Sequence, residues 1–336
     1  MRAIASTMKN DHAPTNGRRS QGAVLPSLHR GGWASFKRFF WKYRFFHLLV
    51  LPGVAFYIIF HYLPMFGILL AFKSYNGMGG VMGIITAPWV GFKHFVALYE
   101  SHFFWRLLKN TLILSGLRLL FAFPAPIILA LLLNEVRARR FQRVVQTITY
   151  LPHFLSWVVI AGLMTMLLGS EGPVNAVLGL LFGTQPIVFL SDNRFFRGVL
   201  VSSGIWQSVG WNSIIYFAAI SGVPQEHYEV AIVEGATRLQ RAWYVTLPWL
   251  SYVIVIRLVL SIGSIINSDF EQIFNLYNAA VYEVSDVFDT FVYRVGLQQR
   301  EFSYATAVGL FKSVVSLLMV IGANRVAKGL GREGLW

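Results

Sequence analysis

Basic residues interrupt three of the long apolar stretches of this sequence, where an unpaired charge is costly. They are Arg118, Arg257 and Lys312. Arg257 is followed by Ser261, Ser264 and Ser268 at spacings that place all four on one face of a helix. Such a row could bind a polar solute as it moves along the helix. Equally, the serines could join helices through hydrogen bonds while Arg257 and Lys312 extend toward the nearer surface.

A second group of polar side chains lies in the stretch from 199 to 223. Ser203, Gln207 and Gly210 recur there at helical spacing. Two neighbours, Trp206 and Asn212, lie close to them in sequence. An indole face can pack against a sugar ring, and an amide can bind its hydroxyl groups. Trp206, Gln207 and Asn212 are therefore further candidates for contact with a polar solute.

Several kinds of reactive site are missing from the sequence. It contains no G-x-x-x-x-G-K-[ST] run, so we expect no ATP binding through a P-loop. It contains no cysteine, and no H-x-x-x-H pair falls on an expected helix. Carboxylates are scarce in the apolar stretches, which argues against a proton relay. We expect neither an enzyme nor a cofactor or metal site on this chain.

The composition predicts an integral membrane protein. Apolar residues make up 55% of the chain and charged residues 13%, whereas charged residues are about 25% of soluble domains. A spanning helix needs about 20 mostly apolar residues, and the apolar runs are continuous, which favours helices over a β-barrel. We predict an all-α bundle of six spans: His47 to Phe72, Leu107 to Leu133, Ile148 to Gly169, Val199 to Val223, Trp249 to Phe270 and Ala305 to Val326.

The net charge of +14 is distributed unevenly along the chain. Eighteen Lys and Arg residues lie in the two tails and in the connections after the second and fourth spans, against eight in the other connections. The positive-inside rule then places both termini in the cytoplasm. The basic, aromatic segment 31–46 is expected to lie at the membrane interface and to contact lipid rather than nucleic acid.

The expected organisation follows from these patterns. A flexible basic tail at 1–30 precedes the interfacial segment, a transmembrane domain occupies 47–327, and a cytoplasmic tail follows at 328–336. The connection from Glu271 to Ser303 is expected to be an external loop. It could receive a soluble delivery protein or merely cap the bundle.

The connection at 223–248 is polar and charged although it lies between two apolar stretches. Its run from Glu229 to Pro248 reads EVAIVEGATRLQRAWYVTLP. Glu229 in the first turn of a helix would suit the positive end of the helix dipole. Gly235 costs about 1 kcal/mol relative to Ala inside a helix, which suggests a break between two helices or a close backbone contact. We expect a short helix here that docks into another protein.

This run resembles the EAA loop of the membrane subunits of bacterial binding-protein-dependent ABC importers of type I. The matching residues are Glu229, Ala231, Gly235, Ala236, Leu247 and Pro248. Val230 stands in place of the first Ala of the motif, Glu234 in place of its Asp, and the aromatic residue is Trp243. The chain is also similar, in its basic tail and six apolar stretches, to carbohydrate-type permease subunits. Within these it is similar to the group that handles oligosaccharides and uronate polymers such as alginate.

The resemblance implies a complex in the bacterial inner membrane with a second related permease, two ATPase subunits and a periplasmic binding protein. Mg-ATP would bind to the separate ATPase subunits, and the complex would alternate between inward-open and outward-open states. The residues implied in ATPase coupling are Glu229, Ala231, Glu234, Gly235, Ala236, Leu247 and Pro248. The competing interpretations are a secondary transporter or channel acting alone, and a membrane anchor without cargo.

Overall fold

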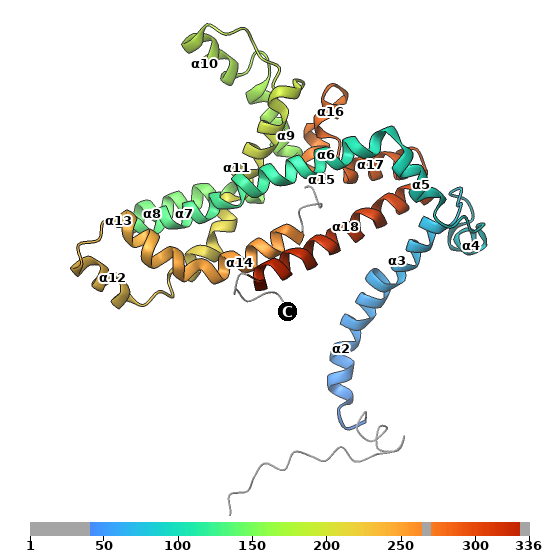
Figure 1. Ribbon diagram of the computed structural model, residues 1–336, viewed down its shortest axis with the longest axis horizontal. Coiled ribbons are helices and arrows are strands. Elements are labelled where there is room, and N and C mark those ends of the chain that lie inside the picture. The colour runs from blue at the N-terminus through green and yellow to red at the C-terminus, as the bar shows by residue number, and fades with distance from the viewer. Residues whose placement is uncertain (1–40, 264–269, 330–336) are drawn as a thin grey trace, which may run out of the picture. The chain divides into compact units, whose positions relative to one another are not determined.

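A computed structural model describes residues 41–263 and 270–329 (Figure 1). Its regular elements in these two ranges are helices, and an isolated bridge joins Lys73 to Trp89. The predicted all-α fold is therefore confirmed. The tail at 1–30 and all but the first two residues of the tail at 328–336 lie outside the described residues. The chain divides into two units, Met1–Pro64 and Met65–Trp336, which are taken in turn.

The first unit contains helix α2 (Arg44–Tyr57) and the π-helical turn η1 (Ile58–Tyr62), and α3 (Leu63–Met65) begins at its end. Helix α2 buries none of its residues within the chain, and Leu49 is 82% exposed. A helix that is apolar on all sides needs an apolar environment, as a membrane span has. Just before it, the Arg44 guanidinium lies 5.5 Å from the Trp41 ring centroid. Residues 31–40 of the expected interfacial segment lie outside the described part.

The second unit consists of helices and short helical turns. In chain order they are η2 (Phe66–Phe72), α4 (Gly80–Thr86), α5 (Lys93–Glu100), α6 (His102–Leu117), η3 (Arg118–Ala122), α7 (Pro124–Glu135), α8 (Arg139–Tyr150), η4 (Leu151–Phe154), α9 (Trp157–Leu168), α10 (Pro173–Phe182), α11 (Asn193–Ile220), α12 (Gln225–Val233), α13 (Arg238–Arg241), η5 (Ala242–Thr246), α14 (Leu247–Gly263), α15 (Phe270–Leu276), η6 (Ala279–Val281), α16 (Tyr282–Ser285), α17 (Phe288–Tyr293), η7 (Arg294–Gln298) and α18 (Phe302–Gly329). Helix α11 packs against α7, α8 and α14, and α18 packs against η2, α14 and α17.

Five helical stretches of the described residues are long and apolar enough to cross a membrane. They are Arg44–Phe72, His102–Glu135, Trp157–Phe182, Arg238–Ile262 and Phe302–Val326. The fourth predicted span, Val199–Val223, lies in α11, which has 28 residues but carries Ser, Gln and Asn side chains along its length. It is long enough but not among these five, so the count of six spans stays a prediction.

The third predicted span, Ile148–Gly169, is not one continuous helix. It contains the end of α8, the turn η4 and a break before α9. Leu155 and Ser156 have extended backbone there, with ψ angles of 137° and 152°. The Ser156 hydroxyl accepts a hydrogen bond from the Val159 amide and so caps α9. The extended residues Leu155 and Ser156 therefore divide the apolar run into two helical parts, and Ser156 is the N-cap of the second.

The expected external loop from Glu271 to Ser303 is also corrected, because most of it is helical and packed. Elements α15 to η7, Phe270–Gln298, form what we call the α15–η7 segment. Ile273, Val281 and Phe288 of this segment are at most 1% exposed. These apolar side chains belong to clusters that also contain residues of α6, α11 and α18. The segment is thus part of the core of the second unit.

A buried carboxylate fixes this segment to α6. Asp286 is 0% exposed and its Oδ2 accepts hydrogen bonds from Arg294 at 2.5 Å and from Arg106 at 3.4 Å. Its Oδ1 accepts a bond from the Thr290 hydroxyl at 2.9 Å. Asn110 of α6 donates to the backbone carbonyl of the same residue at 3.1 Å. A carboxylate can be kept inside a protein only when it is paired and hydrogen-bonded in this way.

Two tyrosines accompany this cluster. The Arg294 guanidinium lies 4.8 Å from the Tyr282 ring centroid, and the Tyr277 ring lies 5.0 Å from the ring of Tyr282. Burial, together with the neighbouring Tyr282, raises the pKa of Tyr277 to about 12. Tyr277 therefore stays a neutral phenol throughout the physiological range.

Gly210 allows α11 to approach the end of α8 closely. A Cβ atom placed on this glycine would lie 2.1 Å from the carbonyl oxygen of Thr149 and 2.9 Å from Tyr150 Cδ1. The Tyr150 side chain also hydrogen-bonds Ser213, one turn farther along α11. Gly210, which the sequence places in a polar row, therefore serves close helix packing.

Gly210→Ala should lower the thermal stability of the purified protein, because overpacking of this kind costs about 1–3 kcal/mol. Gly198→Ala is the matched control on the same helix, since no atom lies within 4 Å of a Cβ placed there. Thermal unfolding in detergent, followed by fluorescence, measures both variants. Equal melting temperatures for the two would contradict the packing assigned to Gly210.

Asp286→Asn should destabilise the second unit by about 3 kcal/mol, because it leaves two partly exposed guanidinium groups, of Arg106 and Arg294, without their buried counterion. The control is Asp192→Asn, which changes a surface ion pair with Arg194, itself 81% exposed, and retains an N-cap residue. Thermal unfolding should separate the two variants clearly. Equal melting temperatures for the Asp286→Asn variant and the parent protein would show that the ion pairs of Asp286 do not stabilise the fold.

Candidate functional sites

The segment predicted to bind a partner forms two short helices joined at Gly235. Helix α12 ends at Val233, and Gly235 follows with a φ of +77°, a left-handed conformation that favours glycine. The Gly235 amide donates to the Ile232 carbonyl at 3.0 Å and the Ala236 amide donates to the Ala231 carbonyl at 2.9 Å. These two bonds form a Schellman motif, which ends a helix. The predicted break is present, and no atom of the described part of the chain lies within 4 Å of a Cβ at Gly235.

A capping box starts the next helix. The Thr237 hydroxyl accepts a hydrogen bond from the Gln240 amide, and the Gln240 side chain accepts one from the Thr237 amide. Helix α13 then continues through the π-helical turn η5 into α14, which begins at Leu247 and Pro248. The chain from Arg238 to Gly263 is therefore one helical stretch that joins the loop to the bundle.

Two contacts attach the loop to the rest of the second unit. The Tyr228 and Thr246 hydroxyls are 2.9 Å apart, and Thr246 is buried. Arg241 forms an ion pair of 3.8 Å with Glu135 at the end of α7. The loop is thus held at its base by side chains from α12, η5 and α7.

The outer side of the loop carries exposed apolar side chains. We call it the α12–α13 patch, and it consists of Val230, Ile232, Val233 and Leu239. Val233 is 87% exposed, and α12 buries none of its residues within the chain. Glu229 and Glu234 are exposed beside the patch, whereas Ala231 and Ala236 are half-buried. An apolar patch on a charged loop is typical of a surface that a protein partner covers.

Arg257 faces α11 from the middle of α14. Its Nη2 donates to the Asn212 Oδ1 at 3.4 Å, and its side chain also hydrogen-bonds Tyr216. The Arg257 Nε is buried, and no atom of residues 41–263 and 270–329 forms a hydrogen bond with it. Ser261 donates to the Arg257 carbonyl at 2.7 Å. Arg257 and Asn212 are thus brought together as two of the predicted solute-binding residues, while Ser264 lies outside the described residues.

The other two candidates on α11 have separate surroundings. Gln207 donates to the His153 carbonyl at 3.5 Å. Trp206 lines an apolar cavity of about 420 Å³ together with Met164 and Phe195. These side chains therefore do not form one site with the Arg257–Asn212 pair.

Arg118 ties three elements together. Its Nη2 donates to Gln272 Oε1 at 2.7 Å. Gln272 is fully buried and donates in turn to the Leu200 carbonyl at 2.6 Å and the Ser203 hydroxyl at 3.0 Å. The predicted polar residues Arg118 and Ser203 are therefore joined through a glutamine that sequence reasoning missed. The sequence signal that could have identified Gln272 is its position just after the apolar run that ends at Phe270.

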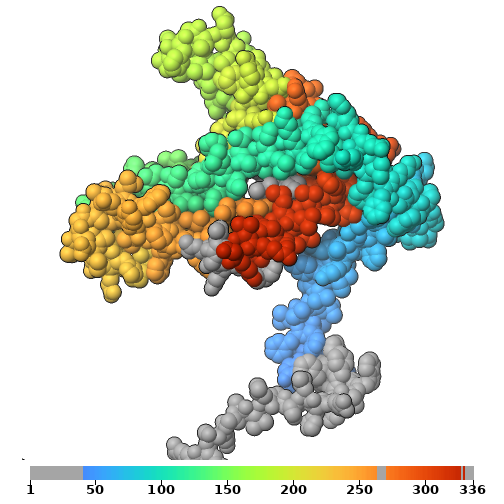
Figure 2. All heavy atoms as spheres, in the orientation of Figure 1, coloured from blue at the N-terminus to red at the C-terminus, as the bar shows by residue number. Residues whose placement is uncertain are grey.

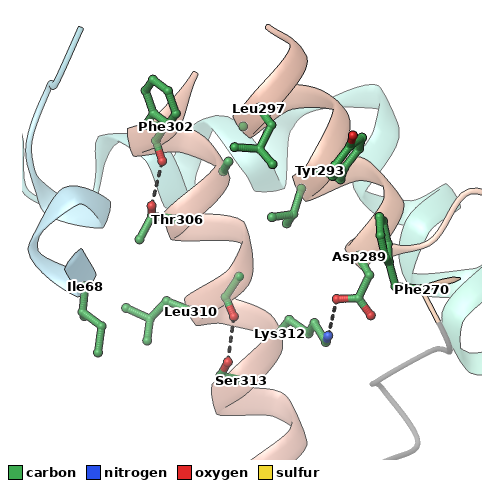
Figure 3. Close-up of a pocket in the computed structure, with 14 residues that line it drawn as sticks. Ile68, Phe270, Asp289, Tyr293, Leu297, Phe302, Thr306, Leu310, Lys312 and Ser313 are labelled. Carbon is green, nitrogen blue, oxygen red and sulfur yellow. Dashed lines mark hydrogen bonds and ion pairs between the residues drawn. The ribbon is translucent and has the colours of Figure 1, made fainter. Parts of the chain in front are cut away.

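Lys312 forms an ion pair with Asp289 of α17, and Figure 3 shows its side chain crossing from α18 toward this carboxylate. The pair lies at a cavity of about 710 Å³ whose wall includes Tyr293 and Phe302. Lys312 thus has an internal counterion, and the alternative that it extends to a surface is wrong. No group of three or more His, Asp or Glu side chains in the described part of the chain is placed to hold a metal ion.

Comparison with known proteins identifies the fold and its role. The family model of the binding-protein-dependent transport system inner membrane component matches residues 122–332. The chain is 45% identical to protein LplB of Bacillus subtilis (strain 168) over 304 residues, which are 90% of this chain and 93% of LplB. It is also 45% identical over 293 residues to the polygalacturonan/rhamnogalacturonan transport system permease protein YteP of the same organism, covering 87% and 90% of the two chains.

Two solved structures are similar over nearly their whole length. One is a bacterial ABC transporter involved in the import of the acidic polysaccharide alginate, with a TM-score of 0.80, 41% identity, and coverage of 88% of this chain and 98% of that chain. The other is a bacterial alginate ABC transporter in complex with an alginate pentasaccharide-bound periplasmic protein, with a TM-score of 0.81, 41% identity, and coverage of 90% and 99%. The chain therefore belongs to the binding-protein-dependent transport system inner membrane components, as a permease subunit of a carbohydrate ABC importer of type I and not an enzyme.

Proposed function

We propose that this permease forms half of the pathway for an acidic oligosaccharide and that ATPase subunits drive it through the α12–α13 patch. A second, related permease supplies the other half, and a periplasmic binding protein delivers the sugar. Mg-ATP binds to the ATPase subunits and not to this chain. The observation that carries the proposal is a helix ended by a Schellman motif at Gly235, whose outer side is apolar and uncovered.

The loop has the properties of a mechanical connection. The patch provides apolar side chains that a cleft in another protein can bury, at roughly 25 cal/mol per Å² of apolar surface. The hydrogen bonds at Gly235 and Thr237 give α12 a defined end and α13 a defined start. The Tyr228–Thr246 contact joins α12 to η5. Because α13, η5 and α14 are continuous, a force transmitted to α13 can reach Arg257 along one helical stretch. This arrangement supports alternating access driven from the cytoplasmic side.

Arg257 is the best candidate for contact with an acidic cargo. A guanidinium group can bind a carboxylate through two parallel hydrogen bonds, and the Arg257 Nε has no hydrogen-bond partner among the described residues. Asn212, its neighbour, can bind hydroxyl groups of a sugar. The comparison with an importer of the acidic polysaccharide alginate supports this choice of cargo.

The location of the charges supports a cytoplasmic position for both termini and for the α12–α13 patch. Lys and Arg are concentrated on the loop side and in the tails. A transporter or channel acting alone would not need an apolar patch on a cytoplasmic loop. A membrane anchor would use the patch but would leave the Arg257–Asn212 pair in the bundle without a role.

Gly235→Trp should reduce ATP-driven uptake about tenfold or more, because the side chain strains a left-handed residue by about 1–2 kcal/mol and obstructs the partner's cleft. Gly235→Asn tolerates the conformation and should retain more activity. Uptake into proteoliposomes and co-purification of the ATPase are the two measurements. Gly183→Trp is the control, since Gly183 has a φ of +63° and also no atom within 4 Å of a Cβ. Full uptake by Gly235→Trp would contradict the coupling role.

Arg257→Ala should reduce uptake of an acidic oligosaccharide about tenfold, as expected for the loss of one charge-assisted contact of about 1.4 kcal/mol. A neutral oligosaccharide of the same length should be affected less, and Arg257→Lys should retain part of the activity. Arg194→Ala, at an exposed arginine, serves as the control. Normal uptake together with normal substrate-stimulated ATP hydrolysis in Arg257→Ala would remove Arg257 from the pathway.

A further inference from the structure

Residues 169–190 form a small lobe at the end of α9. The chain turns at Gly169–Gly172, continues as helix α10 and returns to α11 through residues 183–192. Figures 1 and 2 show the lobe projecting from the second unit, in yellow-green. We call it the α10 lobe. Sequence patterns assign this stretch to a connection between spans, where a water-exposed loop would be expected.

One buried asparagine closes the lobe. The Asn175 side chain donates to the carbonyls of Gly169 and Ile187, at 2.8 and 2.9 Å, and accepts a hydrogen bond from the Ile187 amide at 2.9 Å. Gly183 ends α10 in the left-handed conformation. The turn at Gly172 is so tight that a Cβ there would lie 2.6 Å from the Leu167 carbonyl oxygen. The lobe is therefore a built structure rather than a loose connection.

The surface of the α10 lobe between Glu171 and Asp192 is mostly apolar and carries no charged side chain. Between Glu171 and Asp192 the sequence contains no Asp, Glu, Lys, Arg or His. Leu180 is 86% exposed, and Leu181 and Phe182 are also exposed. The most polar side chain of α10, Asn175, is turned inward and used to close the lobe. Water is a poor environment for such a surface.

The lobe is continuous with a membrane span. Helix α9 has only 12 residues, about 18 Å at 1.5 Å per residue, whereas the hydrocarbon core is about 30 Å thick. The apolar stretch that could cross a membrane runs from Trp157 through α10 to Phe182. The apolar cavity of about 420 Å³ beside Trp206 lies between the end of α9, the returning chain and α11. Its walls are mainly aliphatic and aromatic and could hold an acyl chain.

We propose that the α10 lobe is embedded in the outer part of the bilayer and that phospholipid acyl chains cover Leu180, Leu181 and Phe182. The backbone of α10 satisfies its own hydrogen bonds, which a lipid-facing segment requires. Glu171, Asp192 and Arg194 flank the lobe in the sequence and would lie on its water-facing side. On this arrangement Trp206 faces the lipid side of α11, and it is not a contact for the cargo.

Lipid fits this surface better than a soluble protein does. A docking surface for a soluble partner carries a polar rim around its apolar centre, whereas the run between Glu171 and Asp192 has no charged residue. The α12–α13 patch is the contrasting case, because Glu229 and Glu234 border it. The lobe also continues directly from a stretch apolar enough to cross the membrane, whereas the patch lies on a charged loop.

The absence of native cysteine allows a direct test by spin labelling. Leu180→Cys and Leu181→Cys are labelled with a nitroxide in the importer assembled with its partner subunits, in nanodiscs of phosphatidylethanolamine and phosphatidylglycerol. Collisions with oxygen, which concentrates in the bilayer, are compared with collisions with a water-soluble nickel chelate. Leu49→Cys on α2 is the lipid control and Arg194→Cys is the water control, with side chains 82% and 81% exposed.

The ratio of oxygen to nickel collisions at 180 and 181 should equal that at 49 and exceed that at 194 severalfold. Nickel collisions that dominate at both lobe positions would place the lobe in water and overturn the proposal. Exclusion of both reagents would show that another subunit covers the lobe. Loss of oxygen collisions on addition of the periplasmic binding protein would show that this protein docks there. Either of these two results also overturns the proposal.

Discussion

Basic side chains within apolar helices need a partner inside the chain, and the α15–η7 segment supplies it. Gln272 accepts from Arg118, Asp289 pairs with Lys312, and Asp286 accepts from Arg106. The three partners lie on one run of short helices that packs among α6, α11 and α18. Each of these contacts joins a basic side chain of a long helix to the α15–η7 segment. Arg257 instead contacts the amide of Asn212 on α11.

The length of its hydrogen bond distinguishes Arg257 from Arg118, since the Arg257–Asn212 contact is 3.4 Å and the Arg118–Gln272 contact is 2.7 Å. Gln272 holds Arg118 and Asp289 holds Lys312, so both charges stabilise the fold. Arg257 is placed by Asn212 and Tyr216, and its buried Nε has no hydrogen-bond partner among the described residues. Its helix is the direct continuation of the loop that carries Gly235. The residue with unused binding capacity and the loop with an uncovered apolar surface thus belong to the same helical stretch.

Local signals predicted the parts of this structure that depend on near neighbours. The helical class follows from continuous apolar runs, and the break at Gly235 follows from a glycine inside a helical pattern. The break before α9 was missed although Ser156, an N-cap residue, stands at it. The α15–η7 segment could not be predicted, because Gln272 and Asp286 contact residues 154 and 180 positions away. Such contacts leave no periodic signal, and a charged stretch with tyrosines was interpreted as a loop.

The shared oxygen of Asp286 has a mechanical consequence. Because one carboxylate atom receives both Arg106 and Arg294, separating α6 from η7 would leave the fully buried Asp286 without one of its two counterions. This shared atom therefore resists relative displacement of the two elements. Leu155 and Ser156, which are extended between η4 and α9, interrupt the helical hydrogen bonds instead. The permease thus combines a rigid ionic contact with a break in one of its predicted spans.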